Sequence, residues 1–197
     1  MNKIIKYAGI AGILLPVFMI LSIFLLILST SISFEGSSDI ITILLLWLSN
    51  PFMYIIIIGI PTFFFIWGFK VVAEKTNNNL LKIASYLLII ITIITILFPI
   101  VDTSLSLVPL IIIGTIGSIV SILFGIGLLR LKDQFGSIAN YAGILFIIYS
   151  IIGLVSLIDI DFFVIINGIL GFFETPLLAI TLILGIIILF RASEILD

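Results

Sequence analysis

Six apolar stretches, separated by short segments rich in charged and turn-forming residues, constrain the fold of this chain more than any other feature. A helix rises about 1.5 Å per residue and the hydrocarbon layer of a membrane is about 30 Å thick, so about 20 apolar residues cross it. The sequence therefore predicts an all-α integral membrane protein, a single bundle of six transmembrane helices. We place the spans at residues 8–28, 52–72, 83–101, 108–129, 138–157 and 176–190.

The composition of the chain supports this class and excludes several functions. Hydrophobic residues make up 63% of the chain and charged residues 9%, whereas a soluble domain has about 25% charged residues. Histidine and cysteine are both absent, so the chain has no zinc site of the usual kind, no histidine-ligated haem and no thiol nucleophile. A formal net charge of −2 offers no basic patch to nucleic acid. We expect no cofactor and no nucleic-acid partner.

The basic residues fall on one side of the predicted zigzag of spans. They lie at the amino terminus, in or beside the second and fourth connections and at the carboxyl terminus, whereas the only charged residues on the other side are acids. The positive-inside rule therefore predicts a multi-pass protein of the plasma membrane with both termini in the cytoplasm. The basic residues are Lys3, Lys6, Lys70, Lys75, Lys82, Arg130, Lys132 and Arg191.

Two apolar segments in the predicted outer connections, residues 40–48 and 162–173, are too short to span the membrane. Such segments lie in the membrane interface or dip into it. Asn167 and Gly168 are typical of a turn, so the second segment is either a re-entrant hairpin or a flat amphipathic helix broken at Gly168. We favour the flat helix, because re-entrant backbone needs burial within protein.

Three acids near the last span are candidate functional carboxylates: Glu174, Asp159 and Asp161. Glu174 precedes Arg191 by 17 residues, about 25 Å of helix, so it lies below the outer boundary if Arg191 is at the inner one. An ionisable group at depth indicates a functional site, and the three carboxylates together would offer oxygen ligands to a cation. We favour the alternative, in which the bilayer thins locally and Glu174 reaches the headgroups. No catalytic residue and no metal site are assigned.

Small residues form a stripe along the fourth predicted span, where Gly117, Ser121 and Gly125 are spaced four residues apart. Such a stripe lets a second helix approach closely, either within the bundle or across a homodimer. We favour packing within the bundle, because stripes of this kind are common in proteins with many spans.

Three prolines lie inside the predicted spans or near their ends: Pro16, Pro61 and Pro99. Proline removes a backbone hydrogen bond from a helix, so we expect these positions to be kinked.

The middle of each predicted span carries no charged residue, which argues against a proton pump or a voltage sensor. No paired acid and base is evident, and no histidine is available to activate a serine. Three functions remain. We favour a non-catalytic accessory or structural membrane component, with a membrane-protein partner or a second copy against its lipid-facing helices. The alternatives are a carrier or channel for a neutral or apolar solute and, less favoured, a metal-assisted lipid-modifying enzyme at the outer interface.

Overall fold

The described part of the chain is helical. The computed structural model describes residues 2–31, 55–101, 107–157 and 164–196. No strand occurs within these ranges, which confirms the all-α prediction for them. The elements are α1 (Asn2–Ser31), the π-helix η1 (Ile55–Gly59), α4 (Ile60–Lys75), α5 (Asn79–Val101), α6 (Leu107–Leu129), α7 (Lys132–Phe135), α8 (Ser137–Ser156) and α9 (Val164–Ile195).

Within the residues that the structure describes, five helical segments are long and apolar enough to cross a membrane, as expected of a membrane protein. They overlap the second to sixth predicted spans. The first predicted span, 8–28, lies within α1, a helix of 30 residues. The five segments are Ile56–Lys75, Asn79–Leu97, Ile111–Leu129, Ser137–Ser156 and Pro176–Ile195.

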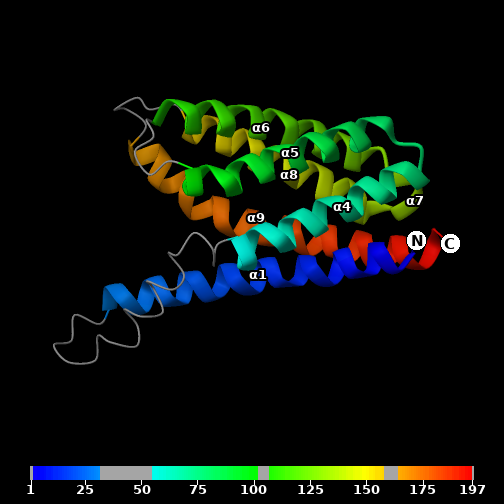
Figure 1. Cartoon of the computed structure of the whole chain (residues 1–197), viewed down its shortest axis with the longest axis horizontal. Coiled ribbons are helices and arrows are strands. Elements are labelled where there is room, and N and C mark those ends of the chain that lie inside the picture. Colours follow the sequence, from blue (N-terminus) through cyan, green and yellow to red (C-terminus); the bar gives the residue numbers. More distant parts are fainter. Residues whose placement is uncertain (1, 32–54, 102–106, 158–163, 197) are drawn as a thin grey trace.

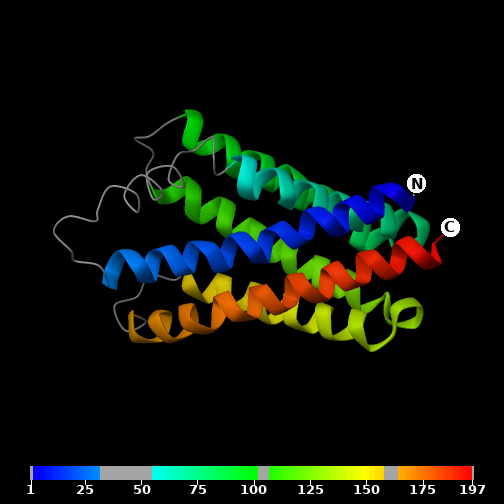
Figure 2. The same cartoon turned by 90° about the horizontal axis from the view of Figure 1, so that it is seen from below.

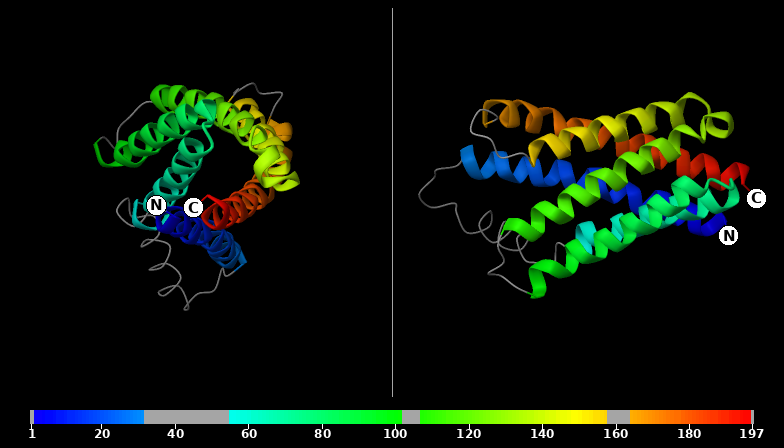
Figure 3. Two further views of the ribbon diagram at one scale, coloured as in Figure 1. Left: turned by 90° about the vertical axis from the view of Figure 1, so that its right-hand side faces the viewer. Right: turned by 90° about the horizontal axis from the view of Figure 1, so that it is seen from above.

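The helices form a ring that follows the order of the chain. α1 packs against α4, α4 against α5, α5 against α6, α6 against α8 and α8 against α9, and α9 returns to α1. Figures 1 and 2 show α1 and α9 running side by side. The left view of Figure 3 looks along the bundle from the end that holds both termini and shows the two termini next to each other. The pairing of α1 with α9 brings the two ends of the chain together and closes the ring.

The end of the bundle that holds both termini also holds the basic residues, and we call it the basic end. It comprises the start of α1, the turn between α4 and α5, the end of α6 with α7, and the end of α9 (Figure 1). All eight lysines and arginines lie in or beside these segments. The structure thus brings together the residues that the charge pattern had placed on one side.

A short turn at the basic end joins α4 to α5. The Thr76 hydroxyl donates to the carbonyl oxygen of Val72 at 2.9 Å and closes the last turn of α4. Asn77 has a φ of 52°, a left-handed conformation in which asparagine is enriched. Oδ1 of Asn78 accepts a hydrogen bond from the Leu81 N–H at 3.1 Å and so caps the start of α5. The asparagine run therefore ends one helix and begins the next.

Aromatic side chains fill the middle of the ring. Phe65 and Phe69 of α4, Phe124 of α6 and Phe146 of α8 are all buried. Their ring centroids follow one another at 5.2, 5.2 and 4.9 Å, distances typical of favourable aromatic pairs. These four residues, which we call the aromatic column, join three helices through one packed core.

Glycines on the two helices that close the ring make room for Phe65. A Cβ atom on Gly12 of α1 would lie 2.6 Å from Phe65 Cδ2, and one on Gly185 of α9 would lie 2.7 Å from its Cζ. Nearby, a Cβ atom on Gly68 of α4 would collide with that of Ala8. Phe65 therefore reaches from α4 to both α1 and α9, and glycine at these positions lets the three helices meet.

The outer surface of the bundle is covered mainly by isoleucine. Most of the large exposed apolar side chains in the described part are isoleucines, such as Ile90, Ile116 and Ile148. Phenylalanine points inward instead: Phe64, which is 47% exposed, is the only phenylalanine in the described part that counts as exposed. The surface around Phe64 is therefore aromatic, whereas most of the described outer surface is aliphatic.

The last helix is longer than the predicted last span. α9 has 32 residues, about 48 Å, and runs without interruption through Asn167, Gly168 and Pro176. Asn167 and Gly168 are both helical, so α9 has neither the re-entrant turn nor the break at Gly168 that the sequence suggested. A helix satisfies every backbone group within the apolar segment itself, whereas a turn inside the membrane would leave such groups unbonded. Residues 40–48, the other predicted outer segment, lie outside the described residues.

A π-helical turn lies directly before Pro61, one of the positions at which a kink was expected. η1 covers Ile55–Gly59 and ends directly before α4, in which Pro61 is the second residue. Proline cannot donate a backbone hydrogen bond and crowds the carbonyl four residues earlier, so a wider turn accommodates it. The same turn brings Gly59 so close to α5 that a Cβ atom there would lie 2.5 Å from Ile96 Cδ1.

Candidate functional site

The predicted carboxylate site lies outside the described side chains. Asp159 and Asp161 are not among the described residues, and Glu174 belongs to α9 with its side chain outside the described part. Among the residues that the structure describes, no three acidic, histidine or cysteine side chains gather in a way that could hold a metal ion. The grouping of the three carboxylates stays a prediction.

Two glycines of the small-residue stripe of α6 lie next to two different helices. A Cβ atom on Gly125 would lie 2.8 Å from Ile147 Cγ1 of α8. A Cβ atom on Gly117 would lie 3.6 Å from Ile91 Cγ2 of α5, which is ordinary contact. Ser121, between them, is half-buried. The closest approach is therefore at Gly125, where α6 meets α8.

The buried hydroxyls of the helices are bonded within their own helix. Each donates its only proton to the carbonyl oxygen four residues earlier, a bond that satisfies the hydroxyl without a partner helix. No charged side chain is buried in the described part of the bundle. The pairs are Ser85 with Leu81 at 2.7 Å, Ser150 with Phe146 at 2.7 Å and Thr181 with Leu177 at 2.6 Å.

Asn78 is the buried polar side chain that joins separate helices. Its amide Nδ2 donates to the carbonyl oxygen of Gly127 in α6 at 2.8 Å, while its Oδ1 caps α5. A Cβ atom on Gly127 would lie 2.8 Å from Leu81 Cα, so α5 and α6 touch backbone to backbone beside this bond. Asn78 thereby fixes the end of α6 against the start of α5.

A charged cluster lies between α4 and α5 at the basic end. Lys70 Nζ is 2.9 Å from Glu74 Oε2, and Lys82 Nζ is 3.6 Å from Glu74 Oε1. The Lys70 side chain is only 13% exposed, and its ammonium lies 5.0 Å from the ring centroid of Trp67 and 5.4 Å from that of Tyr86. The ion pair and the aromatic faces favour the charged ammonium in this position. With two lysines and one glutamate, the cluster keeps an excess positive charge.

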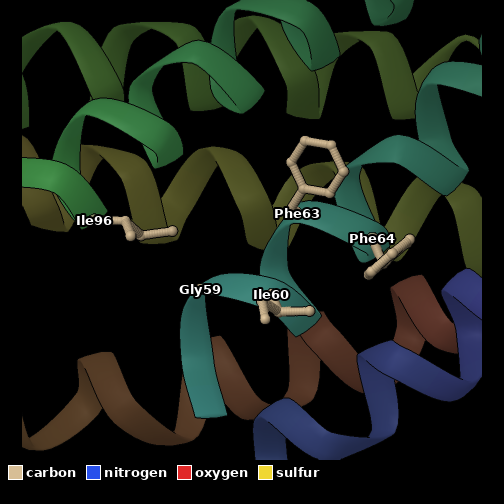
Figure 4. A pocket seen from close by; sticks show the side chains of 5 residues that line it. All are labelled: Gly59, Ile60, Phe63, Phe64 and Ile96. Atoms are coloured by element: carbon tan, nitrogen blue, oxygen red, sulfur yellow. The ribbon is translucent and has the colours of Figure 1, made fainter. Parts of the chain in front are cut away.

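An apolar groove follows the outer face of α4 from this cluster toward η1. It consists of two hollows of about 320 Å³ each, which share Phe63 and Phe64. Phe63 stacks on Trp67 with centroids 5.7 Å apart and meets Phe64 edge-on at 5.6 Å. We call the two hollows together the aromatic groove. The hollow toward α5, shown in Figure 4, is lined by Gly59, Ile60, Phe63, Phe64 and Ile96, and the hollow toward α1 by Ile4, Tyr7, Phe63, Phe64 and Trp67.

The aromatic groove and the bond of Asn78 to α6 were not predicted from the sequence. Phe63, Trp67 and Lys70 are spaced so that they share one face of a helix, a signal that was readable in the sequence. Tyr7 and Ile96 come from α1 and α5, and no spacing rule relates them to α4.

Comparison of the chain with protein-family models, with curated proteins and with solved structures gave no match.

Proposed function

We propose that this chain spans the plasma membrane six times, with both termini in the cytoplasm, and acts as a non-catalytic component of a membrane assembly. The gathering of the lysines and arginines at the basic end supports the orientation, because basic residues stay on the cytoplasmic side. In this arrangement α1 supplies the sixth span beside the five helical segments that are long and apolar enough to cross.

Close aromatic packing in the described part of the interior is the observation that carries the proposed role. The aromatic column occupies the middle of the ring, and the buried hydroxyls in the described part donate within their own helices. A path for an ion or a polar solute needs polar groups or charges along it, and catalysis needs a positioned acid, base or nucleophile. The described interior offers packed phenylalanine instead, which suits a scaffold.

The surface available to a partner is the lipid-facing side of the helices. In a membrane, two helices associate through close fit of their surfaces, because lipid is as apolar as the side chains. The outer faces of α5 and α6 are covered by isoleucines such as Ile90, Ile94, Ile112 and Ile116. Side chains branched at Cβ have few rotamers, so they lose little freedom when a partner helix packs on them.

Native mass spectrometry tests the proposed role. The full-length chain, tagged and purified from its own membrane in a mild detergent, should carry a second membrane protein at fixed stoichiometry or form a defined homo-oligomer. A double substitution on the outer face of α6, Ile112→Ala with Ile116→Ala, should weaken that association. Ile148→Ala, which shortens an exposed isoleucine on α8, is the control and should leave the association unchanged. A bare monomer under the same conditions would contradict the proposal.

Transport of a neutral solute is the alternative to this role and is tested by liposome swelling. Proteoliposomes containing the chain should swell in neutral solutes no faster than empty liposomes, while liposomes with a water-filled porin provide the positive control. Faster swelling that Glu174→Gln alters would replace the proposed role with that of a carrier or channel.

A further inference from the structure

We infer that the aromatic groove binds an acyl chain of an anionic phospholipid whose phosphate lies at the basic end. The inference requires only that the protein lies in a membrane and does not depend on the accessory role. It rests on three properties of the groove: its depth, the order of the residues along it and the charge at its end.

The groove is as deep as one leaflet. From Lys70 to Gly59 the helix advances 11 residues, about 16 Å, and half of the hydrocarbon layer is about 15 Å. Both hollows lie within this length of α4, because every α4 residue that lines them falls between Gly59 and Trp67. A lipid whose headgroup lies level with Lys70 can therefore extend its chain along the whole groove without leaving its own leaflet.

The residues along the groove change in the order that a phospholipid requires. The deep hollow is lined by Gly59, Ile60 and Ile96 together with Phe63 and Phe64, and its wholly apolar walls match the acyl chain. Tyr7 and Trp67 stand near the basic end, and such residues prefer the level of the membrane interface. Lys70 follows one turn beyond Trp67.

Positive charge surrounds the headgroup end of the groove. The cluster of Lys70, Glu74 and Lys82 keeps one positive charge in excess. On the other wall, Lys3 is exposed and precedes Tyr7 by four residues, so it shares the face of α1 that borders the groove. Lys3 forms no ion pair with any residue that the structure describes. Anionic lipids are attracted to basic residues in this position.

The shape of this face fits a lipid chain better than another helix. A partner helix packs closely on small residues or on side chains with few rotamers, whereas the outer face of α4 presents Phe63, Phe64 and Trp67 with hollows beside their rings. Two of the small residues of α4 and α1, Gly68 and Gly12, already face the interior of the bundle. A flexible acyl chain adapts to the irregular surface between the aromatic rings.

Quenching of Trp67 fluorescence by brominated lipids tests the inference. The chain has two tryptophans, so Trp47→Phe leaves Trp67 as the only one. The full-length Trp47→Phe protein is reconstituted with phosphatidylglycerol or phosphatidylcholine brominated near the headgroup end of the acyl chain. Brominated phosphatidylglycerol should quench Trp67 more strongly than brominated phosphatidylcholine at the same mole fraction. Lys3→Gln should lower this preference by up to about fivefold, because a basic residue near the surface contributes about 1 kcal/mol.

Lys132→Gln is the matched control, because it removes one exposed lysine from α7 at the basic end, away from the groove. It should leave the preference unchanged. Equal quenching by both lipids would overturn the inference, and so would a loss with Lys132→Gln as large as that with Lys3→Gln. Absence of quenching by either lipid would also overturn it, since it would show that protein covers the groove.

Discussion

Gly125 of α6 and Gly143 of α8 meet backbone to backbone. A Cβ atom on Gly125 would lie 2.9 Å from the carbonyl oxygen of Gly143, and one on Gly143 would lie 2.7 Å from the carbonyl oxygen of Gly125. Both residues are buried, so neither helix can turn its glycine toward lipid without breaking the contact. This pair sets how closely α6 and α8 approach each other.

Gly143→Ala should destabilise the bundle by about 1–3 kcal/mol, because the added methyl group would have to displace the backbone of Gly125 as well as the Leu129 side chain. Unfolding followed by circular dichroism in detergent measures the change. Gly117→Ala is the matched control on α6, since its Cβ would meet only Ile91 at 3.6 Å. It should be neutral or slightly stabilising, because alanine is the better helix former. Equal losses at both positions would contradict the assigned contact.

Phe124→Ala should cost about 3 kcal/mol of unfolding free energy. Phe124 is 1% exposed and touches both Phe69 and Phe146, so its removal opens a cavity in the middle of the aromatic column. Phe64→Ala removes the same side chain from the lipid-facing surface and should change stability by less than about 0.5 kcal/mol. Thermal unfolding of the two variants in the same detergent compares them, and a larger loss for Phe64→Ala would show that the column does not hold the core.

Asn78→Ala should destabilise the basic end more than Glu74→Gln does. The first change leaves the buried carbonyl oxygen of Gly127 and the N–H of Leu81 without their partner, at a cost of about 1–3 kcal/mol. The second removes a partly exposed ion pair, which contributes about 0.2–1 kcal/mol. Unfolding at low and high salt separates the two: only the effect of Glu74→Gln should shrink as salt rises. A salt-sensitive loss with Asn78→Ala would contradict this account.

The absence of cysteine makes the proposed topology directly testable. Single cysteines at Asn77 and Gln134, both exposed at the basic end, should react with a membrane-impermeant maleimide only after the cell membrane is opened. A single cysteine at Ser104, between the third and fourth predicted spans, should react in intact cells. Labelling of Ser104→Cys only in opened cells would rule out the proposed orientation.

The candidate carboxylate site and the orientation of the chain in the membrane could be predicted from the sequence alone, but the aromatic groove could not. Charge and hydropathy are properties of single segments, so Glu174 and the lysines stand out without knowledge of the fold. The groove depends on Tyr7, Phe63 and Ile96 from three helices, and only their packing brings these residues together.

The sequence by itself determined that the chain is helical, where most of its apolar helices begin and end, and which residues share the basic end. These properties follow from local hydrophobicity, because an apolar segment in a membrane must bond its own backbone. Tertiary structure decided that α1 returns to α9, that Phe65 fits between Gly12 and Gly185, and that α9 continues through Gly168. Side-chain fit settles the first two, because lipid gives apolar side chains no preference between one neighbour and another.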